Sequence, residues 1–565
     1  MKKFFRIIAE LVAEGTDTDI DLILSKLEIP TDDKLGDIAF PCFLPAKHLH
    51  KSPQDIAMEL ASTLKPPSEI SSISADGPYL NFKLSRKSVV EEILSEVRSK
   101  RERYGSSDDY VGQTVVMDFS SPNIAKPFGL GHLRSTVIGN SLMRIYRFCG
   151  YKAVGINHLG DWGTQFGKLI CAYNLWGDKD KLKEDPISEL YRLYVKFHKE
   201  AEGDPSLMEK GREWFRKLED GDEYALTLWK HFKEYSMAEF DKIYDRLGIN
   251  FDFQTGESFY NDKIPAVINR LKDKKLAETS EDALVVKLDK YDMPPLLLKK
   301  KDETTLYATR DLAAAIYRYD TFSFDKLFYI VGSEQKLHFR QLFKVLELMG
   351  YKWADNCYHI EFGRIKFEGE EMSTRKGNII LLEDVIGKSK RLALKIIEGK
   401  NPDIPNKDDV AEQIGLGAVI FAQFSSRRIK NISFSWEEAL NFDGRTGPYL
   451  QYTHARLCSL ERKDVGEMPT PPNLNLLTDQ REFSICKLIG RFPIIIKSAL
   501  SENEPSLIAS YLLELASEFN GYYQNVRILV EDKELKSARM ALSGAVKIII
   551  KIGLNLLGIS SPERM

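Results

Sequence analysis

The sequence contains no apolar run long enough to cross a membrane. A spanning helix needs about 18 or more consecutive apolar residues, and no segment of the 565-residue chain approaches that length. The basic, partly apolar start MKKFFRIIAELVAEG is interrupted at once by acidic residues, and no small-residue cleavage site follows it. This start is typical of an amphipathic helix rather than a signal peptide. We therefore expect no membrane partner.

Cysteine is scarce, and its spacing fits neither a disulfide framework nor a zinc site. No two cysteines form a Cys-x-x-Cys pair, and no Cys/His cluster has zinc spacing. The six are Cys42, Cys149, Cys171, Cys357, Cys458 and Cys486. This usage predicts a reducing, cytoplasmic compartment and no structural zinc.

Net charge is also small, so it identifies no partner. The formal charge of −3 is an average over the chain, and a large protein can bind RNA through local basic patches while staying acidic overall. The hydrophobic content of 43% and charged content of 29% are typical of a globular protein. The length predicts three or four domains.

The first 110 residues predict a small α+β domain. Helical periodicity covers residues 55–64, residues 78–84 alternate like a strand, and residues 86–105 predict a charged helix that ends at Gly105. The polar segment YGSSDDYVGQ that follows is typical of a linker and marks the first boundary.

Residues 111–395 predict a Rossmann-type α/β domain with a parallel sheet. A strand at 114–120 is followed by a helix that Gly150 ends, and then by a second strand from residue 151, which is the order of a nucleotide-binding βαβ unit. Two more strands, at 326–332 and 358–363, flank a helix at 337–350.

Two regions outside this strand–helix pattern are predicted to be helical. Residues 175–300, approximately, are rich in lysine and glutamate and predict a mostly helical insertion. Residues 396–565 consist of long amphipathic patterns and predict a helical bundle.

The turn after the first strand of this domain, KPFGLGHLRST, is suited to phosphate. A helix N-terminus offers unsatisfied N–H groups and a positive dipole end to an anion. Gly129 and Gly131 allow close approach of a ligand, and His132, Ser135 and Lys126 add donors and positive charge. The turn alone is equally compatible with an ordinary capped helix and a solvent-facing histidine, because short Gly-x-Gly turns are common.

Two further segments carry chemistry. EEMSTRKGN places Ser373, Arg375 and Lys376 in a basic, hydroxyl-rich loop that suits pyrophosphate, although a solvated surface turn has the same composition. LYATRD places Tyr307 and Asp311 four residues apart on one face of a helix. The alternative for Asp311 is an ion pair with a nearby arginine, Arg310 or Arg318.

Taken in order, these segments resemble one family. SSPNIAKPFGLGHLRST, NHLGDWGTQFG, LYATRDLAAA, VGSEQKLHFRQLFKVLELMG, MSTRKGN and DGRTGPYLQYTHAR stand in the order found in class I arginyl-tRNA synthetases. The resemblance extends to the ending GISSPERM. It implies a ligase that activates L-arginine with ATP to arginyl-adenylate and transfers arginine to the 3′ end of tRNA(Arg), releasing AMP and pyrophosphate.

The resemblance implies an ATP site with two departures from the family pattern. The His-x-Gly-His motif begins here with Gly129, and the Lys-Met-Ser-Lys-Ser motif has Thr374 in place of its second lysine. The implied catalytic residues are Lys126, His132, Arg375 and Lys376. The implied ATP-binding residues are Gly129, Gly131, His132 and Ser373. Magnesium is expected to be held mainly through the ATP phosphates, because the sequence offers no dedicated acidic cage.

The resemblance also implies the arginine pocket and the tRNA contacts. Asp118 is expected beside the α-amino group and Asp311 beside the guanidinium, with Asn123, Tyr307 and Gln335 completing the pocket. Hydrogen bonds of this kind can select arginine without editing. The implied tRNA-binding residues are Tyr449, Tyr452, Tyr79 and Asn81, with the two tyrosines of the helical domain alternatively in its core.

The overall expectation is a monomer of three domains. Residues 1–110 would contact the tRNA elbow, and residues 396–565 would bind the anticodon. Enzymes of the family need bound tRNA for the first step. Two other function classes stay open at this point: a nucleotidyltransferase that uses the same sheet without tRNA, and a non-enzymatic RNA-binding paralogue.

Overall fold

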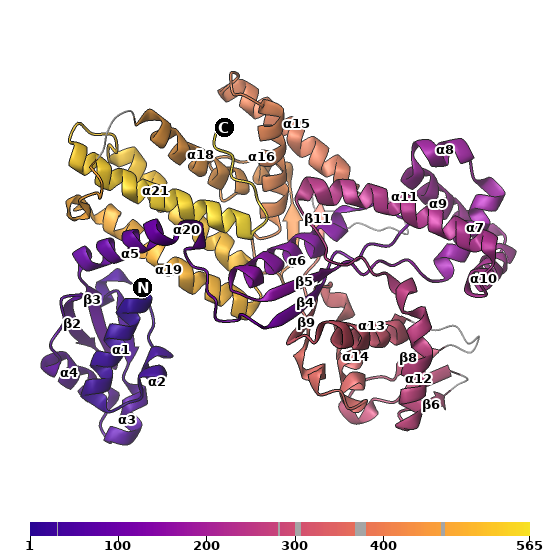
Figure 1. Ribbon diagram of the computed structural model, residues 1–565, viewed down its shortest axis with the longest axis horizontal. Coiled ribbons are helices and arrows are strands. Elements are labelled where there is room, and N and C mark those ends of the chain that lie inside the picture. Colours follow the sequence, from indigo (N-terminus) through magenta and orange to yellow (C-terminus); the bar gives the residue numbers. More distant parts are fainter. Residues whose placement is uncertain (31, 281–282, 300–306, 368–379, 465–468) are drawn as a thin grey trace. The chain divides into compact units, whose positions relative to one another are not determined.

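Four parallel strands form the sheet that positions the candidate active site in this computed structural model (Figure 1). Strand β4 (Thr114–Asp118) lies between β5 (Lys152–Ile156) and β9 (Lys326–Tyr329), and β10 (Cys357–His359) completes the order β10-β9-β4-β5. Each pairing is parallel. The predicted parallel sheet is confirmed, and its strands are shorter than the apolar runs that indicated them.

The structure describes residues 1–30, 32–280, 283–299, 307–367, 380–464 and 469–565. Packing divides the chain into two units. The first comprises Met1–Gly105, Arg456–Ile495 and Tyr511–Ile552, and the second comprises Ser106–Ala455, Ile496–Ser510 and Gly553–Met565. Both units are interrupted in sequence, so the predicted division into residues 1–110, 111–395 and 396–565 stays a prediction.

Three helices flank the parallel sheet and carry the predicted motifs. Helix α6 (Leu130–Phe148) joins β4 to β5, α13 (Tyr307–Phe322) precedes β9, and α14 (Lys336–Leu348) joins β9 to β10. Leu312 of α13 and Leu342 of α14 are fully buried in one core cluster with strand residues such as Val116 and Leu327. Burial of a strand on both faces explains its continuous apolar sequence.

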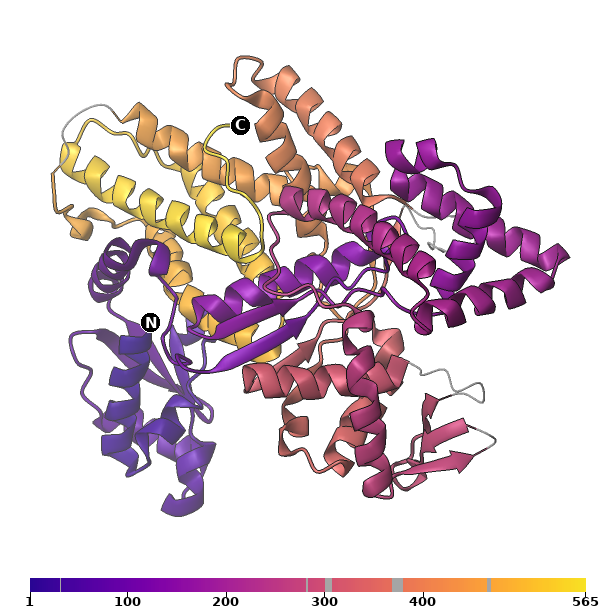
Figure 2. The ribbon, with the colours of Figure 1, turned by 45° about the vertical axis from the view of Figure 1, so that its right-hand side comes forward.

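A long insertion separates β5 from α13. Its helices are α7 (Thr164–Trp176), α8 (Lys179–Glu184), α9 (Pro186–Gly203), α10 (Ser206–Glu219), α11 (Glu223–Leu247), the 3-10 helix η3 (Glu257–Lys263) and α12 (Ile264–Asp273). Figures 1 and 2 show α7 to α11 gathered as one helical group. After α12, the strands β6 (Ala277–Ser280), β7 (Ala283–Val286) and β8 (Leu296–Lys299), with the 3-10 turn η4 (Asp289–Tyr291), form an antiparallel sheet. The sequence did not predict this sheet, because four-residue strands are too short to establish a period.

The N-terminal part of the first unit is an α+β fold, as predicted. Its elements are α1 (Lys2–Thr16), α2 (Ile20–Leu24), η1 (Asp33–Leu35), β1 (Ile38–Pro41), α3 (Phe43–Leu49), α4 (Pro53–Thr63), β2 (Ile70–Asp76), β3 (Tyr79–Leu84), α5 (Arg86–Lys100) and η2 (Arg101–Arg103). The strands pair antiparallel in the order β1-β3-β2. The predicted strand and both predicted helices are confirmed.

The C-terminal part of the chain is helical, as predicted. Its elements are α15 (Leu382–Lys400), α16 (Lys407–Ala422), α17 (Trp436–Ala439), α18 (Gly447–Lys463), η7 (Leu474–Leu476), α19 (Gln480–Glu502), α20 (Ser506–Asn525) and α21 (Lys533–Leu556). A short parallel pair, β11 (Ile365–Phe367) with β12 (Ile432–Phe434), precedes α17. Among the described residues, no helix is both long and apolar enough to cross a membrane. None of the six cysteines is in a disulfide, and all are buried.

Candidate active site

The loop that follows β4 has an unusual backbone. Ser120, Ser121 and Ala125 have φ angles of 71°, 50° and 60°, in the left-handed region that glycine favours. Side chains from other elements hold the loop: the Ser120 N–H donates to Ser135 Oγ at 3.0 Å, and the Ala125 N–H donates to Ser236 Oγ at 2.7 Å. Such residues cost about 1–3 kcal/mol each and cluster at functional sites. The loop is therefore fixed in place by α6 and by α11 of the insertion.

The predicted phosphate turn is capped by its own histidine. The Gly129 N–H donates to His132 Nδ1 at 3.2 Å, so His132 accepts through Nδ1 and carries its proton on Nε2 when neutral. The Leu130 N–H donates to the Ile380 carbonyl at 2.9 Å, and the Leu382 N–H donates to the Phe128 carbonyl at 2.9 Å. The turn thus pairs with residues 380–382, at the start of α15.

His132 is electrically neutral at physiological pH. Burial lowers the pKa of His132 to about 4, and the positive charge of Lys126 acts in the same direction. A neutral imidazole can donate one hydrogen bond from Nε2 but adds no positive charge. Lys126, whose Nζ lies 4.9 Å from the centre of the Tyr194 ring on α9, supplies the charge near this turn.

The two glycines of this turn differ in whether the structure gives a reason for glycine. Gly131 is exposed, and a Cβ placed there would meet no atom within 4 Å, so the space in front of the helix is clear. Gly129 has φ −89° and ψ 163°, an extended conformation that any residue adopts. The backbone therefore does not require glycine at the position where the resembling family has histidine.

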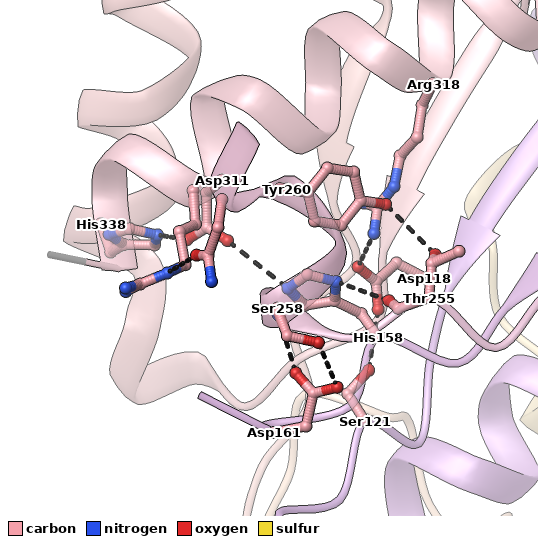
Figure 3. Close-up of polar contacts among 12 residues, drawn as sticks. Asp118, Ser121, His158, Asp161, Thr255, Ser258, Tyr260, Asp311, Arg318 and His338 are labelled. Atoms are coloured by element: carbon pink, nitrogen blue, oxygen red, sulfur yellow. Dashed lines mark hydrogen bonds and ion pairs between the residues drawn. The ribbon is translucent and has the colours of Figure 1, made fainter. Parts of the chain in front are cut away.

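Asp118, at the end of β4, is buried and paired. Its Oδ2 lies 2.8 Å from Nη2 of Arg318 on α13, and its Oδ1 accepts a hydrogen bond from Ser121 Oγ at 2.8 Å (Figure 3). Arg318 is fully buried, and the charge of Asp118 raises the pKa of its guanidinium against the opposing effect of burial. A buried pair of this kind fixes both side chains, since separation would leave a buried charge.

Asp311 faces two histidines. Its Oδ2 lies 2.7 Å from His338 Nε2, and its Oδ1 lies 3.9 Å from His158 Nε2 (Figure 3). Burial raises the pKa of Asp311, but the hydrogen bond and charge of His338 outweigh it, and the net shift is downward. Asp311 reciprocally raises the pKa of His338.

The arginines proposed as alternative partners of Asp311 are engaged elsewhere. Arg318 pairs with Asp118, and Arg310 Nε donates to Asn261 Oδ1 at 3.1 Å. The close partners of Asp311 are therefore histidines, and the alternative of an ion pair with either arginine is wrong. The charge of Arg318 still lowers the pKa of Asp311 from a greater distance.

The other predicted pocket residues lie on three elements. Tyr307 is exposed, one turn before Asp311 on α13, and its hydroxyl lies 3.8 Å from where a Cβ of Gly163 would be. Gln335 is exposed at the end of the 3-10 helix η5 (Ser333–Gln335), directly before α14. The carboxamide of Asn123 lies against Gly160, where an added Cβ would be only 2.1 Å from Asn123 Oδ1.

Four residues of this region were not predicted from sequence. His158 follows β5, His338 lies near the start of α14, Arg318 lies on α13, and Glu257 opens η3. Glu257 is buried, its Oε2 has no hydrogen-bond partner among the described residues, and burial raises its pKa well above the ordinary value. The position of His158 after a parallel strand was an available signal. The other three depend on packing.

The second predicted motif lies outside the described residues. Ser373, Arg375 and Lys376 belong to residues 368–379, so their assignment stays a prediction. The described residues contain no group of three His, Cys, Asp or Glu side chains that could hold a metal ion.

The predicted tRNA-binding residues differ in exposure. On α18, Tyr452 is 38% exposed, which removes the core alternative for this residue, and Tyr449 is half-buried. On β3, the half-buried Tyr79 ring meets the exposed Phe43 edge-on at 6.4 Å, whereas Asn81 is buried within the sheet. Three of the four side chains thus have accessible surface.

Family models cover almost the whole chain. The description "tRNA synthetases class I (R), catalytic domain" applies to the match over residues 92–436. "DALR anticodon binding domain" matches residues 450–565, and "Arginyl tRNA synthetase N terminal domain" matches residues 2–84. The first of these models alone spans more than half of the chain.

Curated relatives and solved structures agree with these matches. The chain is 49% identical to the arginine–tRNA ligase of Alkaliphilus metalliredigens over 96% of both chains, and 48% identical to that of Halothermothrix orenii over 98% of both. Its structure is similar to that of Thermus thermophilus arginyl-tRNA synthetase, with a TM-score of 0.83, 26% identity, and coverage of 99% of this chain and 100% of that one.

Proposed function

The chain belongs to the class I arginyl-tRNA synthetase family, and from that premise we propose which of its residues carry out the reaction. Members of the family are arginine–tRNA ligases, which activate arginine with ATP and charge tRNA with it. ATP, arginine and tRNA are the substrates. The proposal concerns the assignment of side chains, the metal, the domains and the oligomeric state.

Asp311 binds the guanidinium of arginine in this proposal. The observation that carries it is the half-buried carboxylate of Asp311 on α13, whose two oxygens face His158 and His338 from two other elements. Tyr307 lies one turn earlier on the same helix. A lowered pKa keeps Asp311 ionised, as a cationic substrate requires. A planar, always-charged fork matches such a carboxylate better than the ammonium of lysine does.

The remaining pocket residues act on the polar groups of the bound amino acid. Asp118 takes the α-ammonium, since an ionised carboxylate offers about four acceptor positions and the described residues supply two partners for it, Arg318 and Ser121. Asn123 and Gln335 supply amide groups, and Tyr307 supplies a hydroxyl. The pair with Arg318 keeps Asp118 in place when the pocket exchanges its ligand.

ATP binds at the turn that opens α6. Gly129 and Gly131 let the phosphates approach the backbone, and neutral His132 donates from Nε2 to the phosphate that gains charge. Lys126 neutralises that charge. Ser373, Arg375 and Lys376, which are not among the residues that the structure describes, complete the proposed ATP site. Magnesium is held through the phosphates.

The reaction needs no protein nucleophile. The arginine carboxylate attacks the α-phosphate, pyrophosphate leaves, and the terminal ribose hydroxyl of tRNA then attacks the carbonyl and releases AMP. Orientation of the two substrates and fixed donors at the phosphates lower the barrier. We assign tRNA contact to Tyr449, Tyr452 and Tyr79, because the fourth predicted residue, Asn81, is buried and has no surface for it. We assign the tRNA elbow to residues 1–110 and the anticodon to residues 396–565, in a cytoplasmic monomer.

Arginine-dependent ATP–pyrophosphate exchange, measured with and without tRNA, tests the proposal. We expect exchange to require arginine and to be stimulated by tRNA, with the Michaelis constant for arginine rising strongly in Asp311→Asn. Exchange without arginine would indicate a nucleotidyltransferase, and RNA binding without exchange would indicate a non-catalytic paralogue. An unchanged arginine constant in Asp311→Asn would contradict the assignment of the pocket. Light scattering on the purified protein tests the monomer.

A further inference from the structure

The two histidines beside Asp311 play different chemical roles. His338 Nε2 lies 2.7 Å from Asp311 Oδ2, and an ionised carboxylate only accepts, so His338 donates this bond. His158 Nδ1 lies 3.2 Å from the carbonyl oxygen of Thr255, which also only accepts. His158 therefore donates from Nδ1, and its Nε2 carries a lone pair when the ring is neutral.

This lone pair faces a second acceptor. His158 Nε2 lies 3.9 Å from Asp311 Oδ1, too far for a direct hydrogen bond, so the two acceptors face each other across a gap (Figure 3). The ring is fixed on both sides, by the bond to Thr255 and by the ring of Tyr260 at 5.5 Å. Two fixed acceptors that face each other are satisfied by a ligand that donates to both. A planar guanidinium can do so, because its edge presents several N–H groups at once.

We propose that His158 and Asp311 together form the acceptor edge that binds the substrate guanidinium, with His338 as the positioning residue that holds the far oxygen of Asp311. The inference rests on the proposed function, because it takes Asp311 as the guanidinium ligand. It adds a specificity-determining side chain: a neutral histidine whose Nε2 accepts from arginine.

Among the described residues, His158 and Asp311 are the acceptors that face each other here, and the buried Glu257 Oε2 is a further unpartnered acceptor of the same region. His158 is packed among α13, η3 and the loop after β5. The charged and titratable groups around it and Asp311 are His338, Glu257, Tyr260, Tyr307, Asp161, Arg310 and Arg318. Asp161 is occupied by Lys233 and Ser258, at 2.6 Å and 2.7 Å.

The test compares three variants in tRNA-stimulated pyrophosphate exchange. His158→Ala should raise the Michaelis constant for arginine by about tenfold or more and leave that for ATP unchanged, as expected for one lost hydrogen bond to a charged group. His158→Gln, which offers an amide oxygen as acceptor, should recover most of the loss. His231→Ala on α11, an exposed histidine, is the matched control.

Two readouts separate an acceptor role from a purely structural one. The Michaelis constant for arginine should rise while that for ATP does not, and the amide oxygen of His158→Gln should restore arginine binding that His158→Ala loses. An arginine constant for His158→Ala within about twofold of the unaltered protein would overturn the inference. So would an arginine constant for His158→Gln no better than that for His158→Ala.

Failure of the inference and failure of the proposed function are separable. If Asp311→Asn loses arginine affinity while His158→Ala keeps it, only the role of His158 is wrong. If Asp311→Asn also keeps it, the pocket itself is wrongly assigned. Should His158→Ala not fold, the arginine constants of His158→Phe, which keeps a ring without an acceptor, and of His158→Gln, which keeps an acceptor, still decide the matter.

Discussion

Asp118 and Arg318 form an ion pair with a 2.8 Å contact between two side chains that are almost completely withdrawn from solvent. They are 200 residues apart in sequence (118 to 318) and join the end of β4 to α13. Because Asp311 lies on the same helix, this pair fixes the distance between the two carboxylates assigned to the two ends of arginine.

Removal of the Arg318 guanidinium should therefore lower the stability of the fold around the site. In Arg318→Met, Asp118 is left as an unpaired buried charge, and we expect a loss of about 3–5 kcal/mol in the free energy of unfolding. Urea denaturation measures it. The control is Arg212→Met, which breaks an exposed pair with Glu209 and should cost less than about 1 kcal/mol. Equal effects of the two substitutions would contradict the role of the buried pair.

His132 should act in catalysis as a neutral donor. His132→Ala should lower the rate of pyrophosphate exchange by about a hundredfold, because a fixed donor at the developing charge is lost. His132→Asn, which keeps an N–H donor, should retain more activity than alanine. Single-turnover measurement of adenylate formation separates this effect from product release. A rate for His132→Ala equal to that of the unaltered protein would refute the assignment.

The lowered pKa of His132 also predicts how stability depends on pH. The unfolded histidine takes up a proton near pH 6.5, whereas the folded one does so only at about 4. Between these values the unfolded state binds the extra proton, so the contribution of His132 to stability falls as pH falls. The stability of the unaltered protein should therefore drop more than that of His132→Asn between about pH 7 and pH 5. Parallel curves in urea denaturation would count against a buried neutral ring.

Gly160 should be sensitive to a single methyl group. Gly160→Ala places a Cβ about 2.1 Å from Asn123 Oδ1, so Asn123 must move. We expect the Michaelis constant for arginine to rise by about tenfold, with a smaller effect on ATP. The matched control is Gly203→Ala in α9, where an added Cβ meets no atom within 4 Å. An unchanged arginine constant in Gly160→Ala would remove Asn123 from the pocket.

Tyr452 should affect tRNA and not arginine. Its side chain is 38% exposed, and stacking of a tyrosine ring on an unpaired base is worth about 1–3 kcal/mol. Tyr452→Ala should raise the Michaelis constant for tRNA by about fivefold to a hundredfold in aminoacylation. Tyr224→Ala, at an exposed tyrosine of α11, is the control. If the two variants charge tRNA equally well, the contact lies elsewhere.

The sequence predicted the sheet and the motif helices because their periods are strong. The strand at β4, the helix α6 and the strand at β5 follow from an apolar run, a 3.6-residue repeat and a glycine stop. The hydrogen bond from the Gly129 N–H to the His132 side chain is also local, three residues along the chain, but the sequence analysis did not predict it. The antiparallel strands β6 to β8 were missed because each has four residues and no sustained alternation.

The partners of the predicted site residues could not be predicted in the same way. Asp311 meets His158 from 153 residues earlier (311 − 158) and His338 from the next helix, and Asp118 meets Arg318 across the sheet domain. Which histidine or arginine faces a given carboxylate is decided by how helices pack on the sheet. The resemblance to a family identified the carboxylates but gave none of these contacts.

The burial of all six native thiols makes this protein convenient for site-specific labelling. Burial raises the pKa of Cys42 to about 11 and of Cys357 to about 12, so neither the ionised nor the accessible form needed for alkylation is populated in the folded state. A maleimide dye should therefore react with one cysteine introduced at an exposed position and spare the native ones. For the same reason, the rate at which the native thiols are alkylated should measure how often the folded chain opens locally.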